Sequence, residues 1–135
     1  MRALLAGLAV ALIAFGGVGV AAGGKIKSAT EVEVVTVIQR PPDNVVVGAL
    51  TADKRKCVGR RKVEVSFNRQ AGGSFAFGTG RTSPGGDWEA ARATSEVISQ
   101  GPFTSIEAKA RKRVVRVKGK KLICRSDKTL YPLTD

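Results

Sequence analysis

Histidine is absent from this chain of 135 residues, and its absence excludes a large part of enzyme chemistry. Without an imidazole there is no Ser–His or Cys–His nucleophile pair and no histidine general base. The Ser-x-x-Lys pattern of a serine–lysine nucleophile does not occur either. We therefore expect no catalytic residue, no metal and no cofactor, and we predict that the protein is not an enzyme.

Acidic residues are also few, at 11 Asp and Glu against 23 Lys and Arg, and they are scattered along the chain. Scattered acids do not supply the clustered oxygen ligands of a calcium site. Asp87 and Glu89 lie two apart on a predicted strand and so share one face, as a pair of glycosidase carboxylates would. We interpret them instead as two solvated charges beside Trp88.

Aromatic residues make up only 5% of the chain, too few for a platform on which nucleic-acid bases stack. The formal net charge is nonetheless +12, and a charge of this size attracts polyanions. The basic tracts therefore have two interpretations, a solvated surface or a face that binds an anionic partner.

Beyond residue 22 the chain has no long apolar run. Its start combines one positive charge at Arg2, an apolar stretch and small residues near Ala22, which is the layout of a secretory signal. We predict a signal peptide over residues 1–24, cleaved between about Ala22 and Gly24, and one domain over residues 25–135. The predicted location is secreted or extracellular, and intracellular nucleic acid is not an expected partner.

The alternative for the N-terminal segment is an uncleaved anchor, because about 20 apolar residues suffice to cross a bilayer as a helix. Four glycines within the segment weaken it as a permanent helix. In that case the domain would be attached to the outer face of the membrane, and membrane contact is expected only in that case.

Cys57 and Cys124 are the only cysteines, and an isolated pair in an exported chain favours a disulfide. A metal site would require clustered Cys and His, which leaves free thiols as the main alternative. A bridge between positions 67 apart would stabilise the fold by about 4 kcal/mol through loop-closure entropy.

Alternating apolar and polar residues predict strands along most of the remaining chain. The segment 62–67 puts its apolar residues on one face (Val63, Val65 and Phe67), and the segment 31–39 does the same (Val32, Val34, Thr36 and Ile38). Residues 103–110 alternate similarly, and residues 111–121 read as an exposed hairpin that turns near Gly119. Seven or eight such strands predict an all-β fold, an antiparallel β-sandwich after an N-terminal signal helix.

Three local features complete the prediction. Residues 83–86 form a tight turn in which Gly85 takes a positive φ. The single tryptophan, Trp88, fills the core rather than forming a ligand-stacking platform. The pattern of residues 91–101 is ambiguous and fits either a loop or one short helix. In the helix, Val97 and Ile98 would cap the apolar face.

The order of these motifs resembles small exported bacterial proteins with a transthyretin-like, carboxypeptidase-regulatory-like (immunoglobulin-like) β-sandwich. The resemblance runs from Glu31 to Tyr131 through "VVVGALTADKRKCVGRRKVEVSF", "GTGRTSPGGDWEA", "FTSIEAKA" and "LIC". Thr82, Gly86 and Trp88 match the family's T-x-x-G-x-W turn with one extra residue. The following strand departs from the family's aromatic-rich pattern. The resemblance implies a fold and an accessory role, and no catalytic residue.

Two functions are compatible with these observations. The first is a structural or adhesive role at the cell exterior, with another extracellular protein as a partner. The second is a binding module for an anionic cell-envelope polymer or a membrane surface. Clustering of the basic residues on one face would favour the second function, and even scatter the first. The candidate polyanion-binding residues of the hairpin are Arg111, Lys112, Arg113, Arg116, Lys118, Lys120 and Lys121, joined on the preceding loop by Arg60, Arg61 and Lys62.

Overall fold

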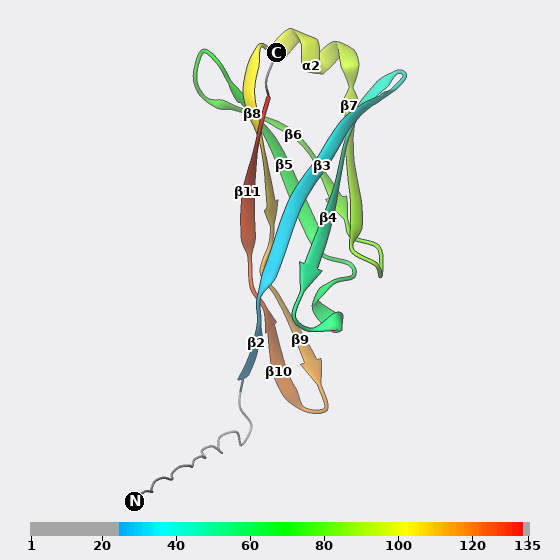
Figure 1. The fold of residues 1–135 in the computed structure, drawn as a ribbon, viewed down its shortest axis with the longest axis vertical. Coiled ribbons are helices and arrows are strands. Elements are labelled where there is room, and N and C mark those ends of the chain that lie inside the picture. The colour runs from blue at the N-terminus through cyan, green and yellow to red at the C-terminus, as the bar shows by residue number, and fades with distance from the viewer. Residues whose placement is uncertain (1–24, 134–135) are drawn as a thin grey trace, which may run out of the picture.

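The computed structural model describes residues 25–133, most of which lie in strands (Figure 1). The predicted signal peptide, residues 1–24, lies outside the described residues. The strands are β2 (Lys25–Ser28), β3 (Thr30–Arg40), β4 (Asp43–Ala52), β5 (Lys62–Arg69), β6 (Ser74–Arg81), β7 (Asp87–Ala93), β8 (Phe103–Ala110), β9 (Arg113–Val117), β10 (Lys120–Cys124) and β11 (Asp127–Pro132). One α-helix, α2 (Thr94–Gln100), and one 3₁₀ turn, η2 (Arg55–Cys57), complete the described elements. The prediction of an all-β fold is confirmed.

The strands form three sheets, two large and one small. The large sheets have the strand orders β3-β4-β7 and β11-β8-β5-β6, with antiparallel neighbours throughout. The small sheet has the order β2-β10-β9, in which β10 pairs antiparallel with β9 and parallel with β2. The structure describes ten strands. The four-residue strand β2 is one that the alternation pattern did not predict, since its pairing with β10 is set by residues almost 100 positions away.

The core lies between the two large sheets. The predicted inward face of β5 is confirmed, because Val63, Val65 and Phe67 are all buried in this core. Phe67 stacks on Phe77 of β6, with ring centroids 4.6 Å apart. Trp88 is 1% exposed, as predicted for a core residue. Both sheets contribute buried side chains to this one cluster.

Trp88 has a specific partner in Gly48, which lies directly opposite it on β4. A Cβ atom at position 48 would overlap the indole ring, so only glycine leaves room for tryptophan there. Close packing is therefore the reason for a glycine inside this strand.

Three local predictions need correction. A bulge at Val35 shifts the register of β3, so that Thr36 is exposed and Val37 packs against the core instead. In the turn after β6, Gly86 rather than Gly85 has the positive φ, at 98°. The ambiguous segment contains the short helix α2, in which Val97 is buried and Ile98 is 73% exposed.

The small sheet lies at one end of the molecule, and its β9–β10 hairpin extends beyond the large sheets (Figure 1). The predicted turn is confirmed: Lys118 and Gly119 both have positive φ, as in the two-residue loop that suits hairpin twist. This sheet has its own small buried cluster of Cys57, Leu122 and Cys124. Among residues 25–133 no helix is both long and apolar enough to cross a membrane.

Candidate anion-binding site

The disulfide connects the small sheet to the loop that precedes β5. Cys57 and Cys124 are joined, with Cα atoms 5.4 Å apart, so the predicted bridge is confirmed. Both residues are fully buried. The bridge fixes strand β10 against η2 and is compatible with an extracellular location, where disulfides persist.

Arg61 lies at the joint between the small sheet and the rest of the molecule, and it is fully buried. The prediction that Arg61 is a surface charge is therefore wrong. Its guanidinium donates hydrogen bonds to four acceptors on separate segments: the carbonyl oxygens of Cys57, Arg111 and Arg125 at 2.7–2.8 Å, and the hydroxyl of Thr30 at 3.1 Å. The two connections that enter and leave the β9–β10 hairpin, which contain Arg111 and Arg125, are thus held by one side chain.

None of the groups that Arg61 contacts is a carboxylate. Desolvation, with a smaller contribution from the charge of Arg113, lowers the pKa of the Arg61 guanidinium below its ordinary value. The dipoles of three carbonyls and one hydroxyl compensate this buried charge, which makes the joint dependent on all four acceptors being in place.

Arg60 and Arg61 take opposite paths because Arg60 has a left-handed backbone, with φ of 58°. Arg60 stays exposed, while Arg61 turns inward. Thr82 fixes this reversal, since its hydroxyl accepts the Arg61 backbone N–H at 2.7 Å and donates to the Val58 carbonyl at 2.6 Å.

Six basic residues surround one cleft of about 420 Å³ at this joint. They come from three parts of the chain, namely the start of β5, the end of β6 and the connection between β8 and β9. Its lining contains no acidic residue, and it consists of Arg60, Lys62, Arg81, Arg111, Lys112 and Arg113. We name these six residues the basic cleft.

The parts of the basic cleft are held in place by contacts between its members and the backbone. The Arg113 guanidinium donates to the Gly59 carbonyl at 2.9 Å, which makes the hairpin base and the cysteine loop neighbours. Lys62 and Arg81 lie directly opposite each other on paired strands, an arrangement that like charges disfavour. Of the six residues of the basic cleft, only Arg111 forms an ion pair within the described part of the chain, with Glu64 at 2.9 Å.

A second group of cations covers the outer face of the small sheet, the side opposite its buried cluster. Leu122 and Cys124 point inward, so Lys121 points outward. It lies between Lys25 of β2 and Arg116 of β9, which face it directly in the strand register. Three cations therefore form a row across the sheet, whose strands contain no Asp or Glu.

The outer face continues into the basic cleft. A depression of about 470 Å³ is lined by Lys25, Lys27, Lys112, Ile123, Arg125 and Ser126. Lys112 belongs to both the depression and the cleft, so the basic surface runs without interruption from one to the other.

The seven predicted hairpin residues are thus divided among several places. Three of them line the basic cleft, namely Arg111, Lys112 and Arg113, while Arg116 and Lys121 lie on the outer face. Lys118 forms the turn, and Lys120 lines a pocket on the inner side of the sheet. The structure brings Arg60 and Lys62 to the cleft and withdraws Arg61 from it.

Sequence reasoning missed Arg81, Lys25, Lys27 and Arg125, which come together with the hairpin only through strand pairing and the chain path. Arg81 carries no local signal, because it faces Lys62 only through a one-residue shift in the pairing of β5 and β6 between Val65 and Ser66. The position of Arg61 does carry a signal: it precedes Val63 by two residues and so continues the buried face of β5.

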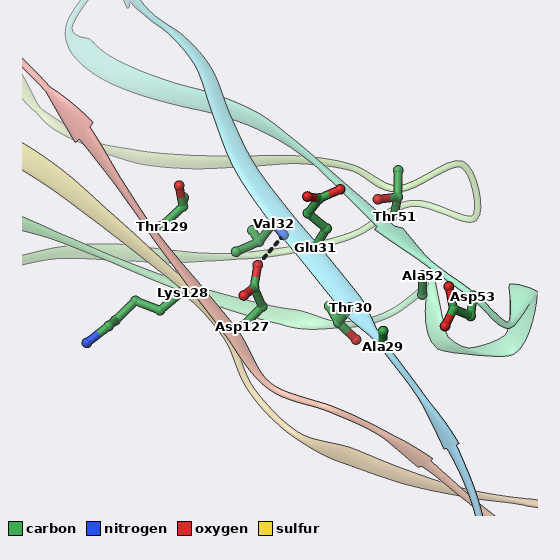
Figure 2. A pocket seen from close by; sticks show the side chains of 10 residues that line it. All are labelled: Ala29, Thr30, Glu31, Val32, Thr51, Ala52, Asp53, Asp127, Lys128 and Thr129. Atoms are coloured by element: carbon green, nitrogen blue, oxygen red, sulfur yellow. Dashed lines mark hydrogen bonds between the residues drawn. The ribbon is translucent and has the colours of Figure 1, made fainter.

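The charge is reversed in a separate cleft between β3 and β11 (Figure 2). The carboxylates of Glu31, Asp53 and Asp127 line it, and Asp127 accepts the Val32 backbone N–H at 2.8 Å. Figure 2 shows the Lys128 side chain directed away from these carboxylates. Within the described part of the chain, no cluster of three or more His, Cys, Asp or Glu could hold a metal ion. This cleft repels anions, so it does not belong to the basic surface.

The acidic pair singled out in the sequence, Asp87 and Glu89, lies on the surface of β7. Both residues share the exposed face of this strand, and Glu89 pairs with Arg40 at 3.2 Å.

In comparisons with known proteins, no protein-family model, no curated protein and no solved structure matches this chain.

Proposed function

We propose that this protein is an exported, non-enzymatic β-sandwich module that binds an anionic cell-envelope polymer through the basic cleft. The transthyretin-like resemblance is consistent with such an accessory module. The observation that carries the proposal is the convergence of six cations from three chain segments on one cleft without an acidic lining residue. Clustering of the basic residues was the property expected to distinguish a binding role from a purely structural or adhesive role. The structural or adhesive role stays a prediction.

The physical cost of the cleft supports this proposal. Like charges on paired strands repel each other, and the free protein bears that cost unless an anion neutralises it. A polymer with regularly spaced negative groups would also release its counterions on binding. Both effects make affinity fall steeply with salt.

The test is retention on immobilised linear polyphosphate across a salt series, using two variants of equal net charge. The cleft variant carries Lys62→Gln, Arg81→Gln and Lys112→Gln. The control removes the same residue types from the large sheets, with Arg40→Gln, Lys109→Gln and Lys128→Gln. Three lost phosphate contacts should reduce the slope of log affinity against log salt by about 2 in the cleft variant, as for a single-stranded polyanion. Equal elution of the two variants would contradict the proposal.

A further inference from the structure

The inner side of the small sheet contains an apolar pocket with a charged rim. Its floor is formed by Ile26, Val117 and Leu122, which lie on the three strands of this sheet. Ile26 faces Leu122 directly in the strand register and is 40% exposed, a large fraction for isoleucine. The pocket has a volume of about 290 Å³ and adjoins the buried cluster of the disulfide.

All the other lining residues of this apolar pocket are cations. Lys54, Arg55 and Lys56 come from the cysteine loop, and Lys120 comes from β10. No acidic residue lines the pocket. The methylene stems of such side chains extend an apolar surface while their charged ends stay in water. An apolar floor inside a ring of positive charge fits a ligand that combines a hydrocarbon part with an anionic head.

A purely polar or a purely apolar ligand would satisfy only one part of this pocket, so the polymer proposed for the basic cleft does not suit it. A hydrophilic polyanion would leave the apolar floor uncovered, and a neutral apolar molecule would leave four cations without a counter-charge. Lys118 in the hairpin turn comes between Val117 and Lys120 of the pocket lining in the chain, so it adds a cation beside the rim. A flat anionic surface can meet these charges together, whereas a bound peptide contacts only a few of them.

We propose that the rim of the apolar pocket inserts into the surface of a bilayer that contains anionic phospholipid. An acyl chain then lies against the floor of the pocket, and the lipid phosphate lies among the rim cations. Each Lys or Arg near such a surface adds attraction, which decays within a Debye length. The sequence linked membrane contact to an uncleaved N-terminal segment. The apolar pocket is a second route that does not require that segment, and it goes beyond the proposed polymer binding.

The test is binding of residues 25–135 to vesicles of phosphatidylglycerol and phosphatidylcholine, against vesicles of phosphatidylcholine alone. Ile26→Ser should weaken binding to the anionic vesicles by about tenfold, because the inserted side chain loses its apolar contact. Val114→Ser is the matched control: Val114 is 47% exposed on the outer face of the same sheet and should have little effect.

A second measurement distinguishes insertion from attraction and does not depend on Ile26→Ser preserving β2. Tryptophan introduced by Ile26→Trp should shift to the blue on binding and be quenched by brominated acyl chains, whereas the same change at Val114 should not respond. Trp88 is buried in both variants and adds a constant background. Binding with no quenching at position 26 would reduce the interaction to charge alone and overturn the proposal. Binding of acidic peptides or polyphosphate, with no binding to the vesicles, would overturn it as well.

Discussion

Between the large sheets the buried side chains are aromatic and branched aliphatic, with three alanines among them, whereas the small sheet buries little more than a disulfide and Leu122. Burial of apolar area stabilises the first region in proportion to that area. The second region buries too few side chains to be stable in this way. It depends on the covalent bridge and on the hydrogen bonds of Arg61.

This difference bears on function as well as on stability. A region held by a crosslink and by one buried side chain does not need its surface residues for folding. The small sheet can therefore carry cations on both of its faces, including the opposed row on the outer face. Each of the three ion pairs of the described residues, by contrast, has at least one partner on a strand of the large sheets, and none involves a strand of the small sheet.

The largest effect is expected from Arg61→Met, which removes the joint between the two regions. Four acceptors would lose their donor in a buried place, and we expect a loss of roughly 5 kcal/mol in the free energy of unfolding. The measurement is urea unfolding followed by the fluorescence of Trp88. Arg60→Met is the control. The side chain of Arg60 is exposed, so this substitution should cost less than about 0.5 kcal/mol. Similar costs for the two variants would contradict the role of Arg61.

The lowered pKa of Arg61 predicts how its contribution to the free energy of unfolding depends on pH. A cation whose pKa is lowered on folding destabilises the folded state at every pH below that value, and the cost is relieved only as pH rises through it. For a guanidinium this window is strongly alkaline. The difference between Arg61→Met and the unaltered protein should thus stay constant from about pH 5 to about pH 9.

The next effect is expected from removal of the disulfide by Cys57→Ala with Cys124→Ala. Loop-closure entropy predicts a loss of about 4 kcal/mol. Because the bridge supports only the small sheet directly, hydrogen exchange should accelerate first in β2, β9 and β10 and later in β5 and β8. A uniform acceleration would show that the two regions unfold as one unit.

The sequence predicted the large sheets better than the small one, for a physical reason. In β5 and β8 the period-two pattern is itself the consequence of a buried face, so residues such as Val65 and Ile106 reveal their positions locally. The bulge at Val35 has no such signature, since Val, Thr and Ile suit either face of a strand.

The candidate site was predictable only in part. The hairpin and its cations follow from the sequence, but the cleft arises where they meet Arg81 and Lys62 across distant strands. Arg61 was misjudged because the charged residues on both sides of it suggested a solvated tract. Its place on the buried side of β5 becomes evident only when the alternation is followed back past Val63.

A smaller effect is expected from Trp88→Phe, which tests the core of the large sheets. The indole Nε1 has no hydrogen-bond partner among the described residues, so the change removes an unsatisfied donor as well as apolar volume. These contributions oppose each other, and we expect a net loss of about 1 kcal/mol, well below the roughly 3–5 kcal/mol typical of Trp→Ala. The measurement is urea unfolding followed by circular dichroism. A loss as large as that of Trp→Ala would mean that the indole N–H contributes to stability.

The smallest effect is expected at the cation row of the outer face, where Lys121 lies between Lys25 and Arg116. Lys121→Glu converts two repulsive cross-strand pairs into two attractive pairs, each worth roughly 0.2–1 kcal/mol. The variant should therefore be more stable by about 1 kcal/mol at low salt, with the gain shrinking as salt screens the charges.

The control for this change is Lys109→Glu on β8 in the larger of the two large sheets. Lys109 lies between Glu64 and Lys128, so reversal of its charge exchanges one attractive and one repulsive pair. Its stability should change little at any salt concentration. A gain at Lys109 equal to that at Lys121 would mean that the net charge of +12, rather than the local row, sets the repulsion. If only Lys121→Glu stabilises the protein and also weakens retention on polyphosphate, the same charges that strain the small sheet are those that bind the polymer.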